Sequence, residues 1–181
     1  MKKTILIVIF VVVVLVAGGY WYNSKDRTPS TSTHESAWIG TTYYPLPQGV
    51  SSNGAGTVGD ARYATYSMAD VTTPNGRELW LSKMKRGTDG VPTFTVTDSL
   101  PFVYSVKDMT LAWGLCGPEN PSSPNAGVAL DSSIVALVNG GKLSTLGRAS
   151  AEQAWKADTT TGKFEIISST GIVCITEGGQ D

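Results

Sequence analysis

The sequence predicts a mainly β domain, an antiparallel sandwich or barrel-like fold with one short helix, preceded by an N-terminal transmembrane helix. Three observations lead to this prediction: one uninterrupted apolar run near the N-terminus, several short runs in which apolar and polar residues alternate, and turns rich in Gly, Pro and Asn between them. Alternation with a period of two is typical of strands that are buried on one face. Many short strands separated by turns indicate an all-β sandwich or barrel.

Residues 1–22 form the predicted membrane segment. Lys2 and Lys3 precede an apolar run that continues from residue 5 to residue 17, and an aromatic cluster follows at residues 20–22. As a helix, the stretch from residue 4 to residue 22 would be about 28 Å long, close to the thickness of about 30 Å of a bilayer's hydrocarbon core. A permanent signal anchor and a cleaved signal peptide both begin in this way.

The end of this segment separates the two alternatives. Ala17 and Gly19 are small residues that suit a cleavage site, which would release a secreted protein beginning at Tyr20. The aromatic cluster suits a membrane interface, and the apolar run exceeds the usual signal-peptide core of about 7–15 residues, so the anchor is favoured. The positive charge before the segment places the N-terminus in the cytoplasm. The predicted localisation is therefore the cell membrane, with a single pass and an extracytoplasmic C-terminal domain.

The rest of the chain divides into a tether and one domain. Residues 23–36 are polar and rich in Ser and Thr, which predicts a flexible tether, and residues 37–181 follow as a single β-rich domain. Without Lys2 and Lys3, the 14 basic residues fall to 12 against 15 acidic ones, a formal charge of −3. This charge argues against nucleic acid as a partner. The predicted partners are the membrane, through residues 1–22, and an envelope protein or polymer.

Cys116 and Cys174 are the only two cysteines, and both lie in apolar surroundings. Outside the cytoplasm they could form a disulfide that closes a long loop and stabilises the fold by roughly 3–4 kcal/mol in the chain-entropy model. The alternative is two buried free thiols. A metal site is the least favoured interpretation, because the chain has no CxxC motif and one histidine.

Turn residues between alternating runs predict three β-hairpins. The clearest has its turn at residues 74–76, and the side chains of its second arm are expected to alternate between two faces. In that arm, Leu79, Leu81 and Lys83 should point one way and Glu78, Trp80, Ser82 and Met84 the other. The three hairpins pair residues 64–72 with 77–85, 133–138 with 142–146, and 163–168 with 172–177.

Four further segments have clear patterns. Residues 93–97 alternate and predict a strand, whereas residues 109–116 are nearly all apolar and predict a central strand. Residues 117–127 contain three prolines and predict a long exposed loop. The sequence from Ser150 to Gln153 resembles a capping box, which predicts a short helix over residues 151–157.

His34 is the only histidine, and it lies in the predicted tether. A catalytic imidazole must be held within hydrogen-bond reach of its nucleophile, so the sequence argues against Ser-His-Asp and Cys-His mechanisms and against His-containing zinc sites. Carboxylates remain as candidate acids and bases, with solvated side chains as the default interpretation. These carboxylates are Glu78, Asp98, Asp108, Glu119, Asp131, Glu152 and Glu165. The sequence assigns no catalytic, cofactor-binding or metal-ligating residue.

Two groups of residues are candidate binding surfaces. Trp38, Tyr43 and Tyr44 either pack as part of the first strand or form a platform for sugar rings or a partner peptide, and packing is the favoured interpretation. The basic cluster at residues 83–86 could meet an acidic polymer. Its simpler interpretation is an exposed edge whose charge discourages pairing between sheets.

These observations predict a membrane-anchored extracytoplasmic domain with a structural or binding role at the cell envelope and without a cofactor. One alternative is a carboxylate-dependent envelope hydrolase, which requires two acids about 5–10 Å apart in a cleft. Another alternative is a subunit of a larger membrane assembly. A non-enzymatic role is favoured because no sequence motif assembles catalytic chemistry.

Overall fold

The computed structural model describes residues 36–102, 108–123 and 127–176. The chain divides into two units, residues 1–34 and 35–181, and the described residues all belong to the second unit. Among them, no helix has the length and apolar character needed to cross a membrane. The predicted membrane segment 1–22 and His34 lie outside the described residues.

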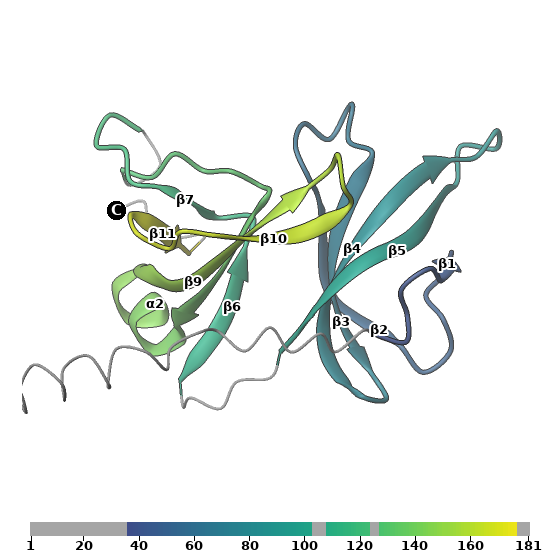
Figure 1. Ribbon diagram of the computed structural model, residues 1–181, viewed down its shortest axis with the longest axis horizontal. Helices are drawn as coiled ribbons and strands as arrows, with labels where there is room; N and C mark the ends of the chain where they lie inside the picture. The colour runs from purple at the N-terminus through teal and green to yellow at the C-terminus, as the bar shows by residue number, and fades with distance from the viewer. Residues whose placement is uncertain (1–35, 103–107, 124–126, 177–181) are drawn as a thin grey trace, which may run out of the picture. The chain divides into compact units, whose positions relative to one another are not determined.

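Five antiparallel strands form sheet 1, in the spatial order β1-β5-β4-β3-β2 (Figure 1). The hairpin predicted around residues 74–76 is confirmed, because Thr73 pairs with Gly76 and β3 runs antiparallel to β4. The strand predicted at residues 93–97 lies within β5. The strands of sheet 1 are β1 (Thr42–Tyr43), β2 (Ser51–Thr57), β3 (Tyr66–Thr73), β4 (Gly76–Arg86) and β5 (Pro92–Pro101).

Six strands form sheet 2, in which β6, β8, β9, β11 and β7 are successive neighbours and β10 also pairs with β9. The long strand β9 has β8 along one edge, and along its other edge it pairs first with β11 and then with β10. The strands of sheet 2 are β6 (Met109–Trp113), β7 (Cys116–Pro118), β8 (Ile134–Asn139), β9 (Arg148–Asp158), β10 (Lys163–Ile167) and β11 (Ile172–Ile175).

One short helix, α2 (Gly140–Leu146), connects β8 to β9. Asn139 caps its first turn by accepting a hydrogen bond from the backbone N–H of Lys142 at 2.9 Å. Gly147 ends the helix in the left-handed conformation, with a φ of 66°. The prediction of a mainly β domain with two antiparallel sheets and one short helix is therefore confirmed, but the helix lies in a different place.

A central apolar cluster lies between the two sheets. Met68, Leu79 and Leu81 of sheet 1 belong to the same buried cluster as Leu111 and Val135 of sheet 2. All five side chains are at most 8% exposed. Burial of apolar surface between two β-sheets is the main stabilising term of a sandwich.

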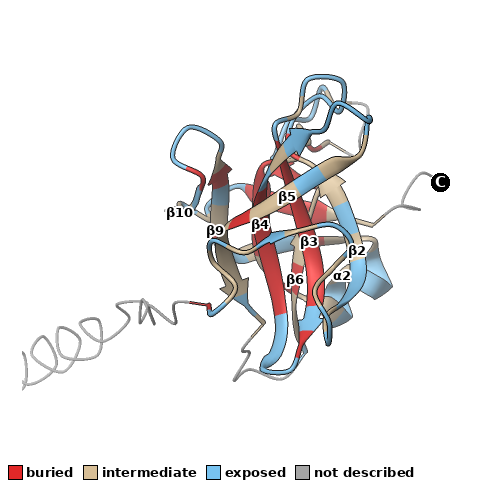
Figure 2. Ribbon diagram, turned by 90° about the vertical axis from the view of Figure 1, so that its right-hand side faces the viewer, coloured by how far each residue is buried: buried red, intermediate tan, exposed pale blue. Residues whose placement is uncertain are grey.

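The outer face of each sheet is also covered. On sheet 1, Trp80 and Val71 pack with Trp38 and Tyr43, which come from the segment before β2. The alternation predicted along β4 is thus confirmed for its buried residues, because Leu79 and Leu81 enter the central cluster and Trp80 the outer one. Figure 2 shows β3 buried along most of its length and β4 buried in its middle, from Glu78 to Ser82.

On sheet 2, a third cluster lies around the two cysteines. Cys116 and Cys174 are fully buried and pack with Ile134, Ala136 and Val138, three buried residues of β8. Leu143 of α2 packs against the same cluster. β8 therefore buries both of its faces, since Val135 belongs to the central cluster.

The two sheets also meet at both of their edges. On one side, Gly54 and Gly56 of β2 lie against the Trp113 ring of β6, and a Cβ atom at Gly56 would come within 3.1 Å of that ring. On the other side, the backbone N–H of Phe164 in β10 donates to Oδ2 of Asp98 in β5 at 2.7 Å. These contacts close the sandwich along its length.

The helix predicted at residues 151–157 is wrong, because this segment is the middle of β9. Its residues are good helix formers, but Ala154 and Ala157 are buried and the strand pairs along both edges. Helix propensity is a weak local preference, and the gain from two rows of sheet hydrogen bonds and from burial overrides it.

Two predicted hairpins are also wrong in their pairing. Residues 142–146 belong to α2 rather than to a strand, so the turn at residues 139–141 begins a helix. Residues 163–167 and 172–175 do form strands, but these pair with β9 and β7 rather than with each other. Sequence patterns identify the strands here, whereas the pairing depends on contacts between distant residues.

The predicted central strand at residues 109–116 is interrupted. β6 ends at Trp113, Gly114 has a φ of 79°, and β7 begins at Cys116. The two strands lie at opposite ends of the strand order in sheet 2. The continuous apolar pattern arises because this segment contributes to two different clusters, Leu111 to the central one and Cys116 to the outer one.

Candidate functional site

The three predicted platform residues lie in two different environments. The Trp80 ring centroid is 5.5 Å from that of Trp38 and 5.7 Å from that of Tyr43. Tyr43 also stacks on Phe94 at 5.5 Å. Tyr44, by contrast, is 60% exposed. Trp38 and Tyr43 therefore contribute to the cluster on the outer face of sheet 1, and Tyr44 alone presents a ring to solvent.

Polar contacts fix this outer cluster. The buried carboxylate of Glu78 accepts hydrogen bonds from Ser36 Oγ at 2.8 Å and from Trp80 Nε1 at 2.9 Å. The Tyr43 hydroxyl lies 3.4 Å from Ser82 Oγ. Burial raises the pKa of Tyr43, and the hydrogen bond with Ser82 opposes this shift only in part. Glu78 thus holds Ser36 against sheet 1.

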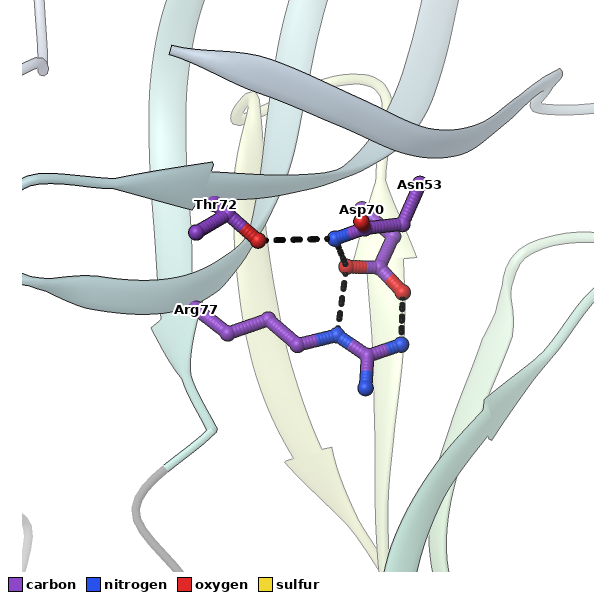
Figure 3. A network of polar contacts seen from close by, with 4 residues as sticks. All are labelled: Asn53, Asp70, Thr72 and Arg77. Atoms are coloured by element: carbon purple, nitrogen blue, oxygen red, sulfur yellow. Dashed lines mark hydrogen bonds and ion pairs between the residues drawn. The ribbon is translucent and has the colours of Figure 1, made fainter. Parts of the chain in front are cut away.

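A second polar network joins β2, β3 and β4 (Figure 3). Asp70, whose side chain is 8% exposed, receives two hydrogen bonds from the Arg77 guanidinium, one of them from Nε at 2.8 Å. Asn53 Nδ2 donates to Asp70 Oδ1 at 3.0 Å and to Thr72 Oγ1 at 3.1 Å. The guanidinium carbon of Arg77 also lies 4.4 Å from the ring centroid of Phe102. The bidentate pair joins β4 to β3, and Asn53 joins β2 to the same carboxylate. The network therefore helps to fix the register of three strands.

The network explains the irregularity in β2. The β2–β3 register shifts between Ser52 and Gly54, which leaves Asn53 without a paired residue and turns its side chain toward Asp70. A bulge often redirects one side chain in this way.

Sequence reasoning did not identify the network formed by Asn53, Asp70 and Arg77. The hairpin register predicted from residues 74–76 places Thr72 opposite Arg77, and that signal could have shown that Asp70 is within reach of the same arginine.

Three other candidate carboxylates also serve structural contacts. Asp98 accepts the N–H of Phe164, and Asp131 accepts hydrogen bonds from Ser133 Oγ at 2.6 Å and Ser133 N at 2.9 Å. Glu119 forms an ion pair with Arg148. The remaining three are solvent-accessible: Glu152 and Glu165 are exposed and Asp108 is exposed with a φ of 70°.

An open depression of about 490 Å³ lies beside β9, β10 and the residues that precede β8, and its lining includes Asp131, Lys156, Asp158 and Glu165. Lys156 Nζ is 3.9 Å from Asp131 Oδ2. The backbone N–H of Thr160 donates to Asp158 at 2.7 Å and lowers the pKa of that carboxyl. A general acid in a glycosidase needs a raised pKa, so this shift has the opposite sign.

The described residues contain no group of three His, Cys, Asp or Glu side chains placed to bind a metal ion. The depression supplies open space and charged side chains, among them three carboxylates, those of Asp131, Asp158 and Glu165.

The two cysteines are joined. Cys116 in β7 pairs directly with Cys174 in β11, and a disulfide links their sulfur atoms. Both side chains are fully buried in the outer cluster of sheet 2. Of the two interpretations that the sequence allows, the bridge is the one that the structure contains.

The end of the β4–β5 hairpin carries a group of basic side chains. Lys83, Lys85 and Arg86 are all exposed, and we call these three residues the cationic tip. Thr93 pairs with Lys85 and Pro92 with Arg86, so beyond Lys83 the hairpin is a two-stranded ribbon. β3 ends its pairing with β4 at Lys83. The ribbon therefore extends past the rest of sheet 1 (Figure 1).

Comparisons with protein-family models, with curated proteins and with solved structures find no match to this chain. The functional argument therefore rests on the residues themselves. The strongest features are the disulfide, the N-terminal apolar sequence and the cationic tip.

Proposed function

We propose that this protein is a membrane-anchored extracytoplasmic domain with a structural or binding role at the cell envelope. The observation that carries this proposal is the buried Cys116–Cys174 disulfide. Disulfides persist in oxidising compartments and are rare in the cytosol of most organisms. An extracytoplasmic location gives the bridge a compartment in which it is stable.

The N-terminal sequence supports the same proposal. Residues 5–17 contain no polar side chain, and Lys2 and Lys3 precede them, which is the pattern of a segment inserted with its N-terminus in the cytoplasm. In this orientation the described domain lies on the side of the membrane where a disulfide is favoured. The charge pattern and the bridge are independent observations that favour one topology.

The polar contacts favour a structural or binding role over hydrolysis. Glu78, Asp98 and Asp131 each accept hydrogen bonds that hold parts of the fold together. Each of these three carboxylates therefore has a structural role in the fold. An acid–base pair would have to come from the exposed carboxylates around the open depression, where the pKa of Asp158 is lowered.

Membrane extraction tests the anchor. Full-length protein and a variant lacking residues 1–22 are expressed in parallel, and the membranes are washed with alkaline carbonate. We expect the full-length chain to remain with the membranes and the shortened chain to be released or lost from them. N-terminal sequencing of the mature protein then separates the anchor from the cleaved form, since cleavage after Gly19 would leave Tyr20 as the first residue. Release of the full-length chain by carbonate contradicts the anchor.

Gentle detergent extraction separates a solitary binding domain from a subunit of a larger membrane assembly. Proteins that co-purify are identified by mass spectrometry, and their amounts are compared with that of this chain. A partner at a fixed ratio would make the protein an assembly subunit. A chain recovered alone directs the search toward ligands at the envelope.

A further inference from the structure

We propose that the cationic tip binds a linear acidic polymer of the cell envelope, one that carries repeated phosphate or carboxylate groups. This inference rests on the proposed extracytoplasmic location, and it names the class of partner that the domain would bind there. The argument depends on the charge, the exposure and the geometry of Lys83, Lys85 and Arg86.

The three cations of the tip have no ion-pair partner among the residues that the structure describes. Of the six other described cations, five each lie within 4.0 Å of a carboxylate, and the sixth, Lys142, forms no ion pair with a described residue. The nearest acid in sequence is Asp89, whose carboxylate accepts the backbone N–H of Val91 at 3.0 Å within the hairpin loop. Within the part of the domain that the structure describes, no ion pair therefore neutralises the positive charge of the tip.

The charge of the tip is opposite to that of the rest of the domain. The described residues hold nine basic and eleven acidic side chains, and three of the nine basic ones form the tip. Outside the tip, the described residues therefore hold six basic and eleven acidic side chains. An anionic partner would be attracted to the tip and repelled elsewhere, which orients the encounter.

The arrangement of the charges favours a chain over a flat surface. Residues two apart in a strand share a face, so Lys83 and Lys85 point to one side of the ribbon and Arg86 to the other. A flexible polymer can pass around a two-stranded ribbon and meet cations on both faces. A bilayer surface would meet the cations of one face while the other face pointed away from the headgroups.

The shortage of exposed apolar side chains in the hairpin also favours a polymer over a bilayer surface. The large apolar side chains that are exposed among the described residues are Tyr44, Tyr63, Leu146 and Ile166, and none of them lies in the hairpin from residue 83 to residue 91. Peripheral membrane segments combine basic residues with apolar side chains that enter the headgroup region. The hairpin itself has the first of these features without the second, and Tyr63 lies outside it, in the adjoining loop.

The loop next to the tip contains an exposed aromatic residue, Tyr63. The backbone N–H of Met84 donates to the carbonyl of Thr65 at 2.8 Å, so the loop that contains Tyr63 runs next to this end of β4. The Tyr63 ring is 78% exposed. Such a ring offers a stacking surface for a sugar unit between the charged groups of an acidic polymer.

Binding of defined polymers tests the proposal on the full-length chain in nanodiscs of neutral phosphatidylcholine. The probes are fluorescent inorganic polyphosphate and polyglutamate, which distinguish phosphate from carboxylate, with neutral dextran as the uncharged control. We expect saturable binding of one or both acidic polymers and none of dextran. The affinity should fall steeply between about 50 mM and about 200 mM salt, because binding releases counterions.

A pair of charge-matched variants identifies the surface. K83Q/K85Q removes two cations from the tip, and K142Q/K156Q removes two exposed cations elsewhere, so both variants have the same net charge. We expect the tip variant to lose affinity on the order of tenfold and to show a weaker salt dependence, while the control changes less than about twofold. R86Q should also weaken binding, because the polymer contacts both faces. Thermal unfolding of each variant verifies that it is folded.

Three results would overturn the proposal: binding of neither acidic polymer, equal losses in the two double variants, or a tip-dependent binding to phosphatidylglycerol vesicles without polymer binding. The last result would assign the tip to a membrane surface instead. None of these results alters the carbonate-extraction result, so failure of the polymer proposal and failure of the proposed location are distinguishable.

Discussion

Asp98 in β5 and Phe164 in β10 join the two sheets, because the backbone N–H of Phe164 donates to the Asp98 carboxylate at 2.7 Å across 66 positions of sequence. Lys163, the neighbour of Phe164, places Nζ 3.8 Å from the other oxygen of the same carboxylate. The Asp98 side chain is 20% exposed. A charged acceptor at this depth is expected to contribute more to stability than a surface ion pair.

Removal of this acceptor should therefore loosen the edge of the sandwich. We expect Asp98→Ala to lower the free energy of unfolding by about 1.5–3 kcal/mol, since the Phe164 N–H then has no partner. Asp98→Asn retains an oxygen acceptor and should cost less. Thermal or denaturant unfolding of the full-length chain in neutral detergent measures both variants. Equal losses in the two variants would assign the effect to charge alone.

The Asp70 network should be worth more than an exposed ion pair of the same residue types. We expect Asp70→Ala to lower the free energy of unfolding by about 2–3 kcal/mol, because it leaves Arg77 and Asn53 without their shared acceptor. Asp60→Ala is the matched control, since Asp60 pairs with Arg62 at an exposed position. The control should unfold at the same denaturant concentration as the wild type. Similar shifts in both variants would contradict this expectation, because they would show that the network adds no more stability than an exposed ion pair.

Close packing around β7 makes one glycine indispensable. A Cβ atom at Gly117 would collide with the backbone carbonyl of Ala129, a group that cannot rotate away. We expect Gly117→Ala to destabilise the domain by at least about 3 kcal/mol or to prevent folding. At Gly54 the nearest atom is 3.8 Å away on the Trp113 ring, so Gly54→Ala should be tolerated. The soluble yield and melting temperature of both variants test this contrast.

Alkaline pH should destabilise the outer cluster of sheet 1 through Tyr43. Burial raises the pKa of Tyr43 in the folded state, so the unfolded chain ionises first as the pH rises. Its contribution to stability is complete below a pH of about 10 and is lost as the pH rises toward the higher folded pKa. We expect Tyr43→Phe to flatten the loss of stability above that pH. Tyr44→Phe, which alters an exposed side chain, is the control and should leave the profile as in the wild type.

Local patterns predicted the parts of the fold that depend on neighbouring residues. The turn at residues 74–76 correctly identified the β3–β4 hairpin, and alternation along β4 correctly separated Leu79 and Leu81 from Trp80. In both cases the signal and the structure it predicts lie within a few residues.

Contacts between distant residues decided the parts that the sequence missed. Residues 151–157 are good helix formers, and they form a strand because β8 and β10 pair along both of their edges. Similarly, β10 and β11 follow one another along β9, an arrangement that the turn signal at residues 169–171 does not reveal. Tertiary pairing outweighs local propensity at each of these positions.

The same distinction separates the candidate sites that were visible in the sequence from those that depend on tertiary contacts. The cysteine pair and the basic cluster were visible in sequence, because residue type alone suggests their chemistry. The Asp70 network and the Asp98 contact were not, since each depends on a bulge or on an approach of two sheets. The sequence could not show that the cations at residues 83–86 form no ion pair with a described carboxylate, which is the observation that supports a binding role.

Protease accessibility on intact spheroplasts tests the central claim, that residues 35–181 lie outside the cytoplasm. Spheroplasts that contain the full-length chain are treated with a protease that cannot cross the membrane, and a cytoplasmic protein serves as the integrity control. The account predicts that the domain is degraded while the control survives, and that Cys116 and Cys174 resist thiol labelling until a reductant is added. Protection of the domain until the cells are lysed, with both thiols free, would contradict it.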